Sequence, residues 1–378
     1  MGLKQMFLNI FFGRKLSSSV VNLGNNKKYY NIKLKSKNKI YYNIQSNKMG
    51  IRYLNKFLRT ECKGDNIKFI SIAELSGKKI AVDISIYLYK FSGDDSLIEN
   101  MYLMLSIFRH YGVIPIFVFD GKAPTEKKEL LRKRSDDKNA ARDEFNTLKM
   151  QLAEDGNKMD NEEKQELMNT MDILKKKFIT IKREQIEEVK DLIRAYGATY
   201  FDAPGEADEL CASLVIKNKV WACLSEDMDM FVYGCTRVLR YFSLMNHTVV
   251  LYNTKGILDE LGITQKELRE ICVLSGTDYN CDSEPSLYIT LKHFKKFHKE
   301  TKNKKLEVDF YTWLLNNTNY IEDYERLKII YNMFDLNTTI NSHENIAIFE
   351  NITIRNGYIM QQEIYKILAN NGFIMAAL

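Results

Sequence analysis

The chain has 378 residues, with 55 Lys and Arg against 49 Asp and Glu, and a formal net charge of +6. Hydrophobic residues make up 45% and charged residues 28%, a composition that excludes a wholly disordered chain. No run approaches the roughly 18 consecutive apolar residues of a membrane span, which excludes an integral membrane protein. The length allows one large α/β domain or two or three smaller units.

The positive charge is concentrated at the N-terminus. Residues 1–48 contain nine Lys and one Arg, and the first acidic residue of the chain is Glu61. Without those ten basic residues, 45 basic residues face 49 acidic ones, so residues 49–378 carry a net charge of −4. An acid-poor, basic N-terminal segment has the character of a transit peptide. The alternatives are a disordered arm and a true start at Met49.

Cysteine and histidine show no pattern of a metal site or a catalytic triad. The six cysteines form no C-x-x-C pair, and no histidine has a Cys or His at ligand spacing. Scattered cysteines in a long chain are typical of a reduced, intracellular protein. We therefore expect neither a disulfide framework nor chemistry based on histidine.

Along the chain, short buried strands alternate with helices. Apolar runs at 78–83, 114–120, 220–225 and 238–242 have the composition of buried strands. Residues 96–111 carry apolar side chains at helical spacing between the first two runs. This alternation predicts an α/β domain with a central, twisted, mostly parallel sheet and helices on both faces.

Residues 125–195 interrupt this alternation with charged, helix-forming sequence. Gly156 and Asn157 are expected to form the turn between two long helices, and such a pair is more often a scaffold than a functional lid. The first helix, however, carries a basic excess directly after a strand-end acid, which indicates phosphate contact. Its basic residues are Lys127, Lys128, Arg132, Lys133, Arg134, Lys138 and Arg142.

A second basic stretch lies at residues 291–305, which contain seven lysines and one acid. It could bind a polyanion, or it could be the solvated face of a helix. Residues 306–378 are helical or mixed by composition and contain no motif that indicates a role.

Acidic side chains follow the ends of three predicted strands. Because the carboxyl ends of parallel strands share one crevice, these acids are expected to meet, together with two from a helix start after Pro204 and one after an apolar run. Each acid alone is most simply a cap or turn residue. The acids are Asp83, Asp120, Glu206, Asp208, Asp227, Asp229 and Asp278.

Such a cluster would need cations. Gathered carboxylates repel and raise one another's pKa unless ions neutralise them. Oxygen ligands without His or Cys select hard ions, Mg²⁺ or Mn²⁺. Two such ions about 4 Å apart would stabilise the attacking and leaving oxygens in phosphodiester hydrolysis.

The sequence resembles the flap endonucleases, which are XPG-like structure-specific 5′ nucleases. The order and separations of the matching segments agree over about residues 49–300. These segments are MGI at 49–51, GKKIAVDIS at 77–85, VFDGKAP at 118–124, DAPGEAD at 202–208, SEDMD at 225–229 and LSGTDY at 274–279.

The resemblance implies a domain plan. A PIN-like nuclease core spans residues 49–265 and includes a helical arch over about 122–195. A helix–two-turn–helix-like region at 266–305 binds duplex DNA. The extension 1–48 precedes this plan, and the role of residues 306–378 is unknown.

The resemblance also assigns the seven acids as ligands of two Mg²⁺ ions, for which Mn²⁺ can substitute. Asp208 stands where flap endonucleases carry Glu, and the exonuclease branch carries Asp there, which leaves the branch open. Lys127 and Arg134 match the basic residues that act on the scissile phosphate. Their separation of seven residues predicts one helix face, two turns apart.

Further DNA contacts follow from the resemblance. Tyr89 matches an aromatic residue on which a terminal base stacks, with an ordinary core aromatic as the alternative. Gly50 is expected near the substrate junction. The remaining expected contacts are basic residues of the two basic stretches, namely Lys128, Arg132, Lys133, Lys292, Lys295, Lys296 and Lys299.

Two segments depart from the family pattern. Relatives hold downstream DNA and a potassium ion at a Gly-Ile-Gly turn, and residues 284–290 occupy that place without glycine. The nearby lysines are expected to compensate electrostatically. The sliding-clamp motif of relatives has only a partial counterpart: Gln361 begins it, but Ile367 and Leu368 stand where paired aromatic residues belong.

The implied activity is Mg²⁺-dependent cleavage of DNA at 5′-flap/duplex junctions in replication and repair, by a monomer, through in-line attack of a metal-activated water. The alternatives are a 5′–3′ exonuclease, a junction-binding module without catalysis, and a nuclease directed at RNA. The expected compartment is the nucleus or a viral replication site, or the mitochondrion if residues 1–48 are a transit peptide.

Overall fold

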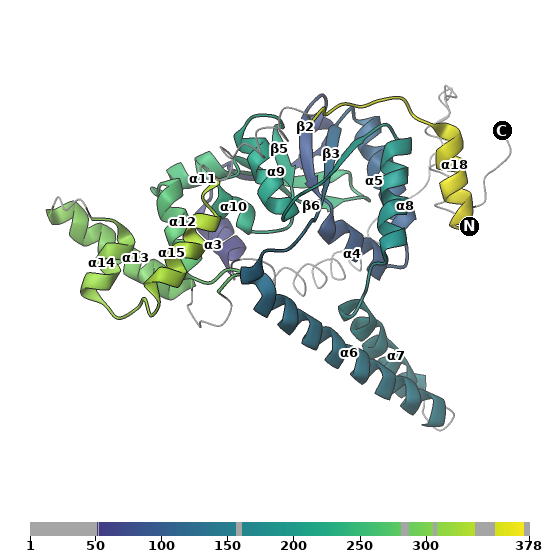
Figure 1. The fold of residues 1–378 in the computed structure, drawn as a ribbon, viewed down its shortest axis with the longest axis horizontal. Helices are drawn as coiled ribbons and strands as arrows, with labels where there is room; N and C mark the ends of the chain where they lie inside the picture. The colour runs from purple at the N-terminus through teal and green to yellow at the C-terminus, as the bar shows by residue number, and fades with distance from the viewer. Residues whose placement is uncertain are drawn as a thin grey trace, which may run out of the picture. The chain divides into compact units, whose positions relative to one another are not determined.

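A computed structural model describes residues 51, 53–155, 161–280, 287–304, 308–336 and 352–373 (Figure 1). The predictions for residues 1–48, Met49, Gly50, the Gly156-Asn157 turn and residues 284–286 lie outside the described residues. Of the helices in the described ranges, none combines the length and apolar composition needed to cross a bilayer.

One mixed sheet organises the described residues, with the strand order β1-β7-β6-β5-β2-β3-β4. From β6 to β4 every neighbouring pair is parallel, whereas β7 runs antiparallel to both β6 and β1. The mostly parallel sheet is therefore confirmed. The strands are β1 (Ile67–Ser71), β2 (Lys79–Asp83), β3 (Ile114–Phe119), β4 (Thr199–Asp202), β5 (Ala222–Leu224), β6 (Arg237–Ser243) and β7 (Thr248–Asn253).

The antiparallel edge was not predicted. A connection as short as residues 244–247 can join β6 and β7 only as a hairpin, because a parallel crossover needs a dozen or more residues. The strand expected at 238–242 is thus one arm of that hairpin.

Helices cover both faces of the sheet (Figure 1). They are α3 (Leu54–Glu61), α4 (Ser85–Gly93), α5 (Leu97–His110), α6 (Lys128–Asp155), α7 (Asn161–Lys177), α8 (Arg183–Ala195), α9 (Ala207–Ile216), α10 (Asp229–Tyr233), α11 (Thr254–Leu261), α12 (Gln265–Leu274), α13 (Leu287–Lys304), α14 (Phe310–Asn317), α15 (Tyr324–Met333) and α18 (Gln361–Asn370). The short 3-10 helices η1 (Ile72–Leu75) and η2 (Thr125–Lys127) precede β2 and α6.

The alternation of side chains along β2 creates two separate cores. Ala81 faces a cluster that contains buried residues of α3, α9, α10 and α12. Ile80 and Val82 face a cluster formed with α4, α5, α8 and α18. Both faces are therefore apolar, which is why β2, β3 and β5 appear in the sequence as nearly continuous apolar runs.

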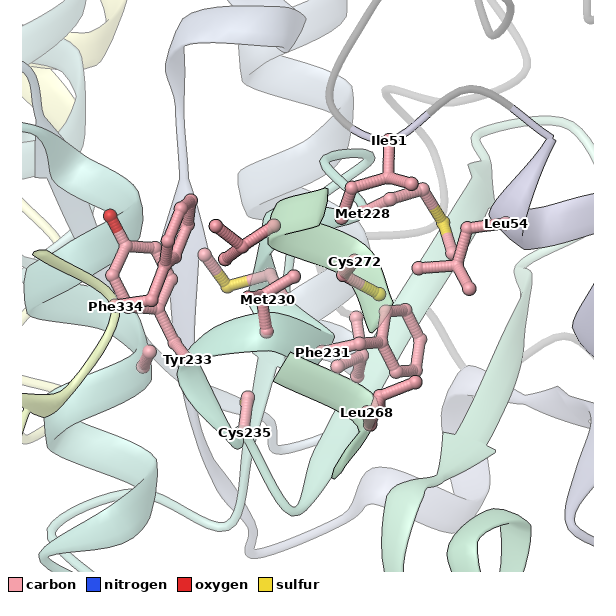
Figure 2. Packing of buried hydrophobic residues seen from close by; sticks show 14 of the residues in the cluster. Ile51, Leu54, Met228, Met230, Phe231, Tyr233, Cys235, Leu268, Cys272 and Phe334 are labelled. Carbon is pink, nitrogen blue, oxygen red and sulfur yellow. The ribbon is translucent and has the colours of Figure 1, made fainter. Parts of the chain in front are cut away.

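The loop after β5 is held from both sides by the first of these cores. Met228 is buried beside Ile51 and Leu54, and Phe231 lies beside Leu268 of α12 (Figure 2). Met228 and Met230 flank Asp229 in the sequence, and both are buried. The backbone that carries Asp229 is consequently fixed by apolar packing.

The charged insertion contains three helices where the sequence predicted a pair. α6 and α7 pack against each other. α8 belongs to the sheet, because Val189, Leu192 and Ile193 are fully buried in the second core. The helical spacing of these residues distinguishes α8 from the polar pair. The inserted pair thus ends with α7, short of residue 195.

Residues 352–373 return to the edge of the sheet. Gly357 N donates to Gly197 O at 2.7 Å, and Met360 N donates to Ala195 O at 2.7 Å. Ile364 and Leu368 of α18 are buried against the second core. The partial clamp motif therefore contributes apolar side chains to internal packing.

Candidate active site

The centre of the sheet brings the strand-end acids together. The chain proceeds from β2 to β3 and β4 on one side, and then from β5 to β6 on the other. Asp83 ends β2 and Asp120 directly follows β3, while Asp227 and Asp229 follow β5. Because these three strands are adjacent, all four acids lie at the point where the strand order reverses, the usual place of a ligand site in such sheets.

A close backbone approach adds the acids of α9. Gly121 N donates to Gly205 O at 2.7 Å, and a Cβ on Gly121 would collide with the carbonyl oxygen of Ala203. Only glycine permits this contact. Asp120 then accepts a hydrogen bond from Ala207 N at 2.9 Å, at the first residue of α9. Glu206 is thereby placed beside Asp120.

Three carboxylates form the tightest group. Asp208, Asp227 and Asp229 each offer an oxygen, and these oxygens lie within 4.8 Å of one another. Burial, followed by the neighbouring acids, raises the pKa of Asp208 and of Asp229 well above the usual value of a carboxyl. One oxygen of Asp229, Oδ1, is buried without a hydrogen-bond partner.

Asp83 is held at the rear of this group. Ser225 Oγ donates to Asp83 Oδ2 at 2.9 Å. Burial first, and then the charge of Asp120, raise the pKa of Asp83 to about 7. Asp227 N donates to Ser225 Oγ at 3.1 Å, which closes the loop after β5. Ser85 Oγ donates to Asp120 Oδ2 at 2.5 Å and orients the remaining strand-end acid.

This donor set fits a hard divalent cation. It contains only oxygen donors, and a carboxylate cluster with raised pKa values is stabilised when a cation neutralises it. The unpartnered oxygen of Asp229 points to the same conclusion, because a buried carboxylate oxygen without a partner is costly. Mg²⁺ and Mn²⁺ match this chemistry.

Two basic residues border the acids. Lys127 Nζ lies 2.5 Å from Glu206 Oε1 and 3.7 Å from Asp278 Oδ2. Arg134 Nη2 lies 2.8 Å from the same oxygen of Asp278. Burial acts to lower the pKa of Lys127, but Asp208, Glu206 and Asp278 raise it overall, so the ammonium stays charged.

The predicted common helix face for these two residues is wrong in detail. Lys127 ends η2, and α6 begins at Lys128, so only Arg134 is on the long helix. The tighter turn directs the Lys127 side chain toward Glu206, whereas Arg134 reaches the acids from the next turns of α6. The two cations nevertheless meet at Asp278.

The other predicted contacts lie on exposed helix faces. Tyr89 of α4 is 43% exposed, which excludes the core alternative, and Lys138 Nζ of α6 lies 5.1 Å from its ring centroid. The lysines and arginines predicted as further contacts are all exposed, on α6 and on α13. They are Lys128, Arg132, Lys133, Lys292, Lys295, Lys296 and Lys299.

The residues that hold the acids in place were not predicted from the sequence. Tyr279 Oη donates to Glu206 Oε2 at 2.6 Å. Ser85 and Ser225 lie two residues from an acid, a spacing typical of local hydrogen bonds that could have identified them. Tyr279, which directly follows Asp278, gave no such signal.

Arg240 was also missed. Its side chain is buried in β6, where Nη2 donates to Glu226 O at 2.6 Å and Nη1 contacts Met228 Sδ at 2.7 Å. Glu226 in turn accepts a hydrogen bond from Tyr241 N at 2.6 Å. Arg240 therefore contacts both neighbours of Asp227, the backbone carbonyl of Glu226 and the side chain of Met228. A charged residue within an apolar strand was the available signal.

Two family models match the parts of the chain that contain this site. The XPG N-terminal domain model matches residues 49–141, and the XPG I-region model matches residues 197–278. Together these regions contain all seven acids, Lys127 and Arg134. The regions that the models leave out include α7 and everything after Asp278.

Curated relatives are similar over the same part of the chain. Flap endonuclease 1 of Glossina morsitans morsitans is 31% identical over 252 residues, which cover 62% of this chain and 62% of the relative. The flap endonuclease 1 of Trypanosoma brucei brucei is 32% identical over 253 residues, with 61% of each chain covered. The similarity thus spans less than two thirds of these relatives.

Solved structures share the fold. The catalytic core of Rad2 in complex with DNA substrate is 22% identical, with a TM-score of 0.55, and the match covers 85% of this chain and 94% of the catalytic-core chain. GEN1 in complex with product DNA and a Mg²⁺ ion is 17% identical, with a TM-score of 0.55, covering 84% and 72%. Both XPG regions are present in order and contain all seven acids, and the chain is therefore similar to XPG-like nucleases in sequence and shares the fold of their solved cores.

Proposed function

We propose that the chain is a Mg²⁺-dependent structure-specific 5′ nuclease that cleaves DNA at 5′-flap/duplex junctions. The observation that carries this proposal is the group formed by Asp208, Asp227 and Asp229, with an unpartnered buried oxygen on Asp229 and two cations beside it. Scaffold acids are rarely buried in this way, because each charge would need a partner.

In this proposal the seven acids hold two divalent ions. Asp208, Asp227 and Asp229 supply the donors that lie closest together, and the remaining four ligands are Asp83, Asp120, Glu206 and Asp278. When bound, the ions supply charge stabilisation at the phosphate and lower the pKa of water. Ser85, Ser225 and Tyr279 keep Asp120, Asp83 and Glu206 in place for this role.

Lys127 and Arg134 act on the scissile phosphate. Both groups are close to the acids yet retain donors, since an ammonium has three and a guanidinium five. Arg134 offers a planar fork that matches two phosphate oxygens, and Lys127 donates to a third. These donors stabilise the charge that develops on the phosphate, and their alignment by η2 and α6 before the reaction makes them effective.

The exposed basic residues hold the DNA strands. Lys128, Arg132 and Lys133 lie on the first turns of α6, next to Lys127. A strand that places its scissile phosphate at Arg134 would pass along these residues. Their contribution depends on salt, because each phosphate contact releases counterions.

A cleavage panel tests the activity. The full chain is incubated with labelled flap, nicked, gapped and single-stranded DNA, and with an RNA flap, in Mg²⁺ and in EDTA. We expect cleavage of the DNA flap in Mg²⁺ alone. Binding without cleavage of any substrate in Mg²⁺ or Mn²⁺ would favour a junction-binding module, and preference for the RNA flap would contradict the choice of DNA.

A 5′-end label decides between the two branches of the family. An endonuclease releases the whole flap, whereas a 5′–3′ exonuclease releases single nucleotides. The observation that favours the second branch is Asp208, whose side chain is one methylene shorter than the Glu of flap endonucleases. Replacement of Asp208 by Glu should shift the product pattern toward whole flaps if this residue sets the branch.

The proposed setting is DNA replication and repair, in the nucleus or at a viral replication site, or in the mitochondrion if residues 1–48 are a transit peptide. The test compares the full chain with a chain that begins at Met49. Localisation in cells and flap cleavage in solution are measured for both. A mitochondrial signal that disappears in the shorter chain would support targeting.

A further inference from the structure

Two exposed tyrosines from distant parts of the sequence meet beside α13. Tyr53 directly precedes α3, and Tyr288 is in the first turn of α13. Their ring centroids are 6.1 Å apart and the ring planes are inclined by 44°. The residues are 55% and 49% exposed, although packing usually covers large aromatic side chains. The pair thus presents an apolar corner to solvent.

Tyr53 has an unfavourable backbone conformation at this exposed position. Its φ of 66° and ψ of −4° lie in the left-handed region, which disfavours a bulky side chain. The flanking residues Ile51 and Leu54 are buried beside Met228 (Figure 2). Tyr53 is therefore anchored on both sides by residues that pack under the loop carrying Asp227 and Asp229.

Exposed lysines lie near both tyrosines in the sequence, on α13 and on α3. The buried face of α13 contains Leu287, Thr290, Phe294 and Phe297, which turns Tyr288 and the lysines outward. Lys292, Lys295 and Lys299 follow Tyr288 at intervals of four, seven and eleven residues, on the same helix face. On α3, exposed Lys56 follows Tyr53 by three residues. Residues 287–299 contain no acid.

We propose that Tyr53 and Tyr288 form a stacking site for a base of the DNA substrate, with Lys56 and Lys292 contacting the phosphates on either side of it. Aromatic rings between cationic side chains are the arrangement that binds unpaired nucleotides. The inclination of the rings suits a single base that lies on one ring and touches the edge of the other. This inference rests on the proposed function, because it assumes a DNA substrate.

The charge pattern favours DNA over a protein partner at this surface. A protein-binding patch would be centred on a larger apolar area, whereas the tyrosine pair is continued mainly by lysines. The site is also connected to the acidic centre through Met228, which contacts the residues around Tyr53. A bound base would thus be positioned by the same packing that positions Asp229.

The test measures the affinity of the full chain for a fluorescent 5′-flap DNA in EDTA, where hydrolysis cannot interfere. Replacement of Tyr53 or Tyr288 by Ala should weaken binding by about 5- to 150-fold, the range for loss of one stacked base. The Phe variants keep the ring and should bind within about twofold of the unchanged chain. Tyr358→Ala is the matched control, because Tyr358 is 95% exposed and lies in residues 352–373, away from α3 and α13 in the sequence.

Salt dependence separates stacking from charge. Lys292→Gln should reduce the slope of log K against log salt by about one unit, since one phosphate contact is lost. Tyr288→Ala should leave this slope unchanged while lowering affinity, because stacking releases no counterions. Thermal unfolding of each variant verifies that the fold is intact.

Cross-linking gives a result that does not depend on variants. A flap DNA with 5-iododeoxyuridine at successive positions is irradiated with the unchanged chain, and the linked residue is identified by mass spectrometry. A link to Tyr53 or Tyr288 supports the site. Ala variants that bind like the unchanged chain, or Phe variants as weak as the Ala variants, would overturn it. If the chain binds flap DNA in this assay but never cleaves it in Mg²⁺, the proposed function fails and the stacking site stands.

Discussion

The acidic centre and the basic helix faces are constructed in opposite ways. Asp83, Asp208 and Asp229 are buried at a strand end or a helix start, and a serine or a backbone amide donates to Asp83, Asp208 and Asp227. The seven lysines and arginines of α6 and α13 that were predicted as further DNA contacts are exposed on their helices. The acidic centre holds a few charged side chains in fixed positions. The helix faces carry many charged side chains whose positions are little constrained.

The difference indicates how each region acts. A buried carboxylate interacts strongly with an ion because little water screens it, but removal of any neighbour disturbs it. An exposed lysine contributes little to the free energy of DNA binding, because salt screens its charge, and a neighbouring lysine can replace it. We therefore expect single changes to have large effects in the centre and small effects on the helices, and four experiments test this contrast.

The largest effect is expected for Asp229→Asn. Loss of an ion ligand should lower the cleavage rate by about 1,000-fold, since the bound ion supplies several kcal/mol of charge stabilisation. The same change removes a buried charge, so the ion-free variant should unfold at a higher temperature than the unchanged chain. Single-turnover cleavage and thermal unfolding measure the two effects. Asp259→Asn, on the exposed face of α11, is the control, and a normal rate for Asp229→Asn would refute the ligand assignment.

Arg134→Ala should lower the single-turnover rate by about 100-fold, the scale for loss of one donor at a developing charge. Arg132→Ala on the same helix removes an exposed charge and should mainly weaken binding, by about threefold at low salt. The comparison uses saturating DNA for the rate and EDTA for the affinity. Equal effects of the two changes would contradict the distinction between the acidic centre and the helix face.

Arg240→Met should weaken Mg²⁺ binding without touching a ligand. The guanidinium contacts both neighbours of Asp227, and loss of such support costs about tenfold or more in metal affinity. Raising Mg²⁺ should therefore restore the rate, a response that a merely unstable variant would not show. Arg237→Met in the same strand is the control, because Arg237 lies over Trp221, away from this loop. If the Arg240→Met variant and the unchanged chain have the same cleavage rate at every Mg²⁺ concentration, Arg240 does not support the metal site.

The smallest effect concerns pH. The pKa of Asp83 is raised from 3.8 to about 7, so the ion-free folded state binds more protons than the unfolded state between these pH values. Its stability should therefore fall as the pH rises from about 4 to about 7, by roughly 5 °C or more in Tm. Mg²⁺ should stabilise the chain more at pH 8 than at pH 5, because the ion competes with protons. Calorimetry with and without Mg²⁺ checks the sign, and higher ion-free stability at pH 8 would contradict it.

The central strands and the acidic site could be predicted because they depend on local sequence patterns. Apolar runs indicated β2, β3 and β5, and the rule that parallel strands end at one crevice predicted that Asp83, Asp120 and Asp229 would meet. It could not predict the short turn that places Lys127 before α6, because η2 and a helical start have the same composition. The partners of Arg240 and Tyr279 were also not predictable, since their contacts join segments that only the folded chain brings together.

The position of α8 against the sheet also could not be predicted from local sequence. Its charge and helical propensity resemble those of α6 and α7, so composition grouped the three helices together. The stripe of Val189, Leu192 and Ile193 distinguishes α8, but the partner of that stripe is provided by α5 and α18, far away in the sequence.

The return of residues 352–373 to the edge strand β4 has a consequence for how the protein is made. Gly357 and Thr353 hydrogen-bond to Gly197 and Thr199, and α18 covers α8. During synthesis the acids of the active site leave the ribosome well before this segment, so β4 stays an open edge that can pair with another chain. Residues 352–373 therefore cover the edge of a sheet whose strands have already been made, and nascent chains stalled before residue 352 should require chaperones that chains stalled beyond residue 373 do not.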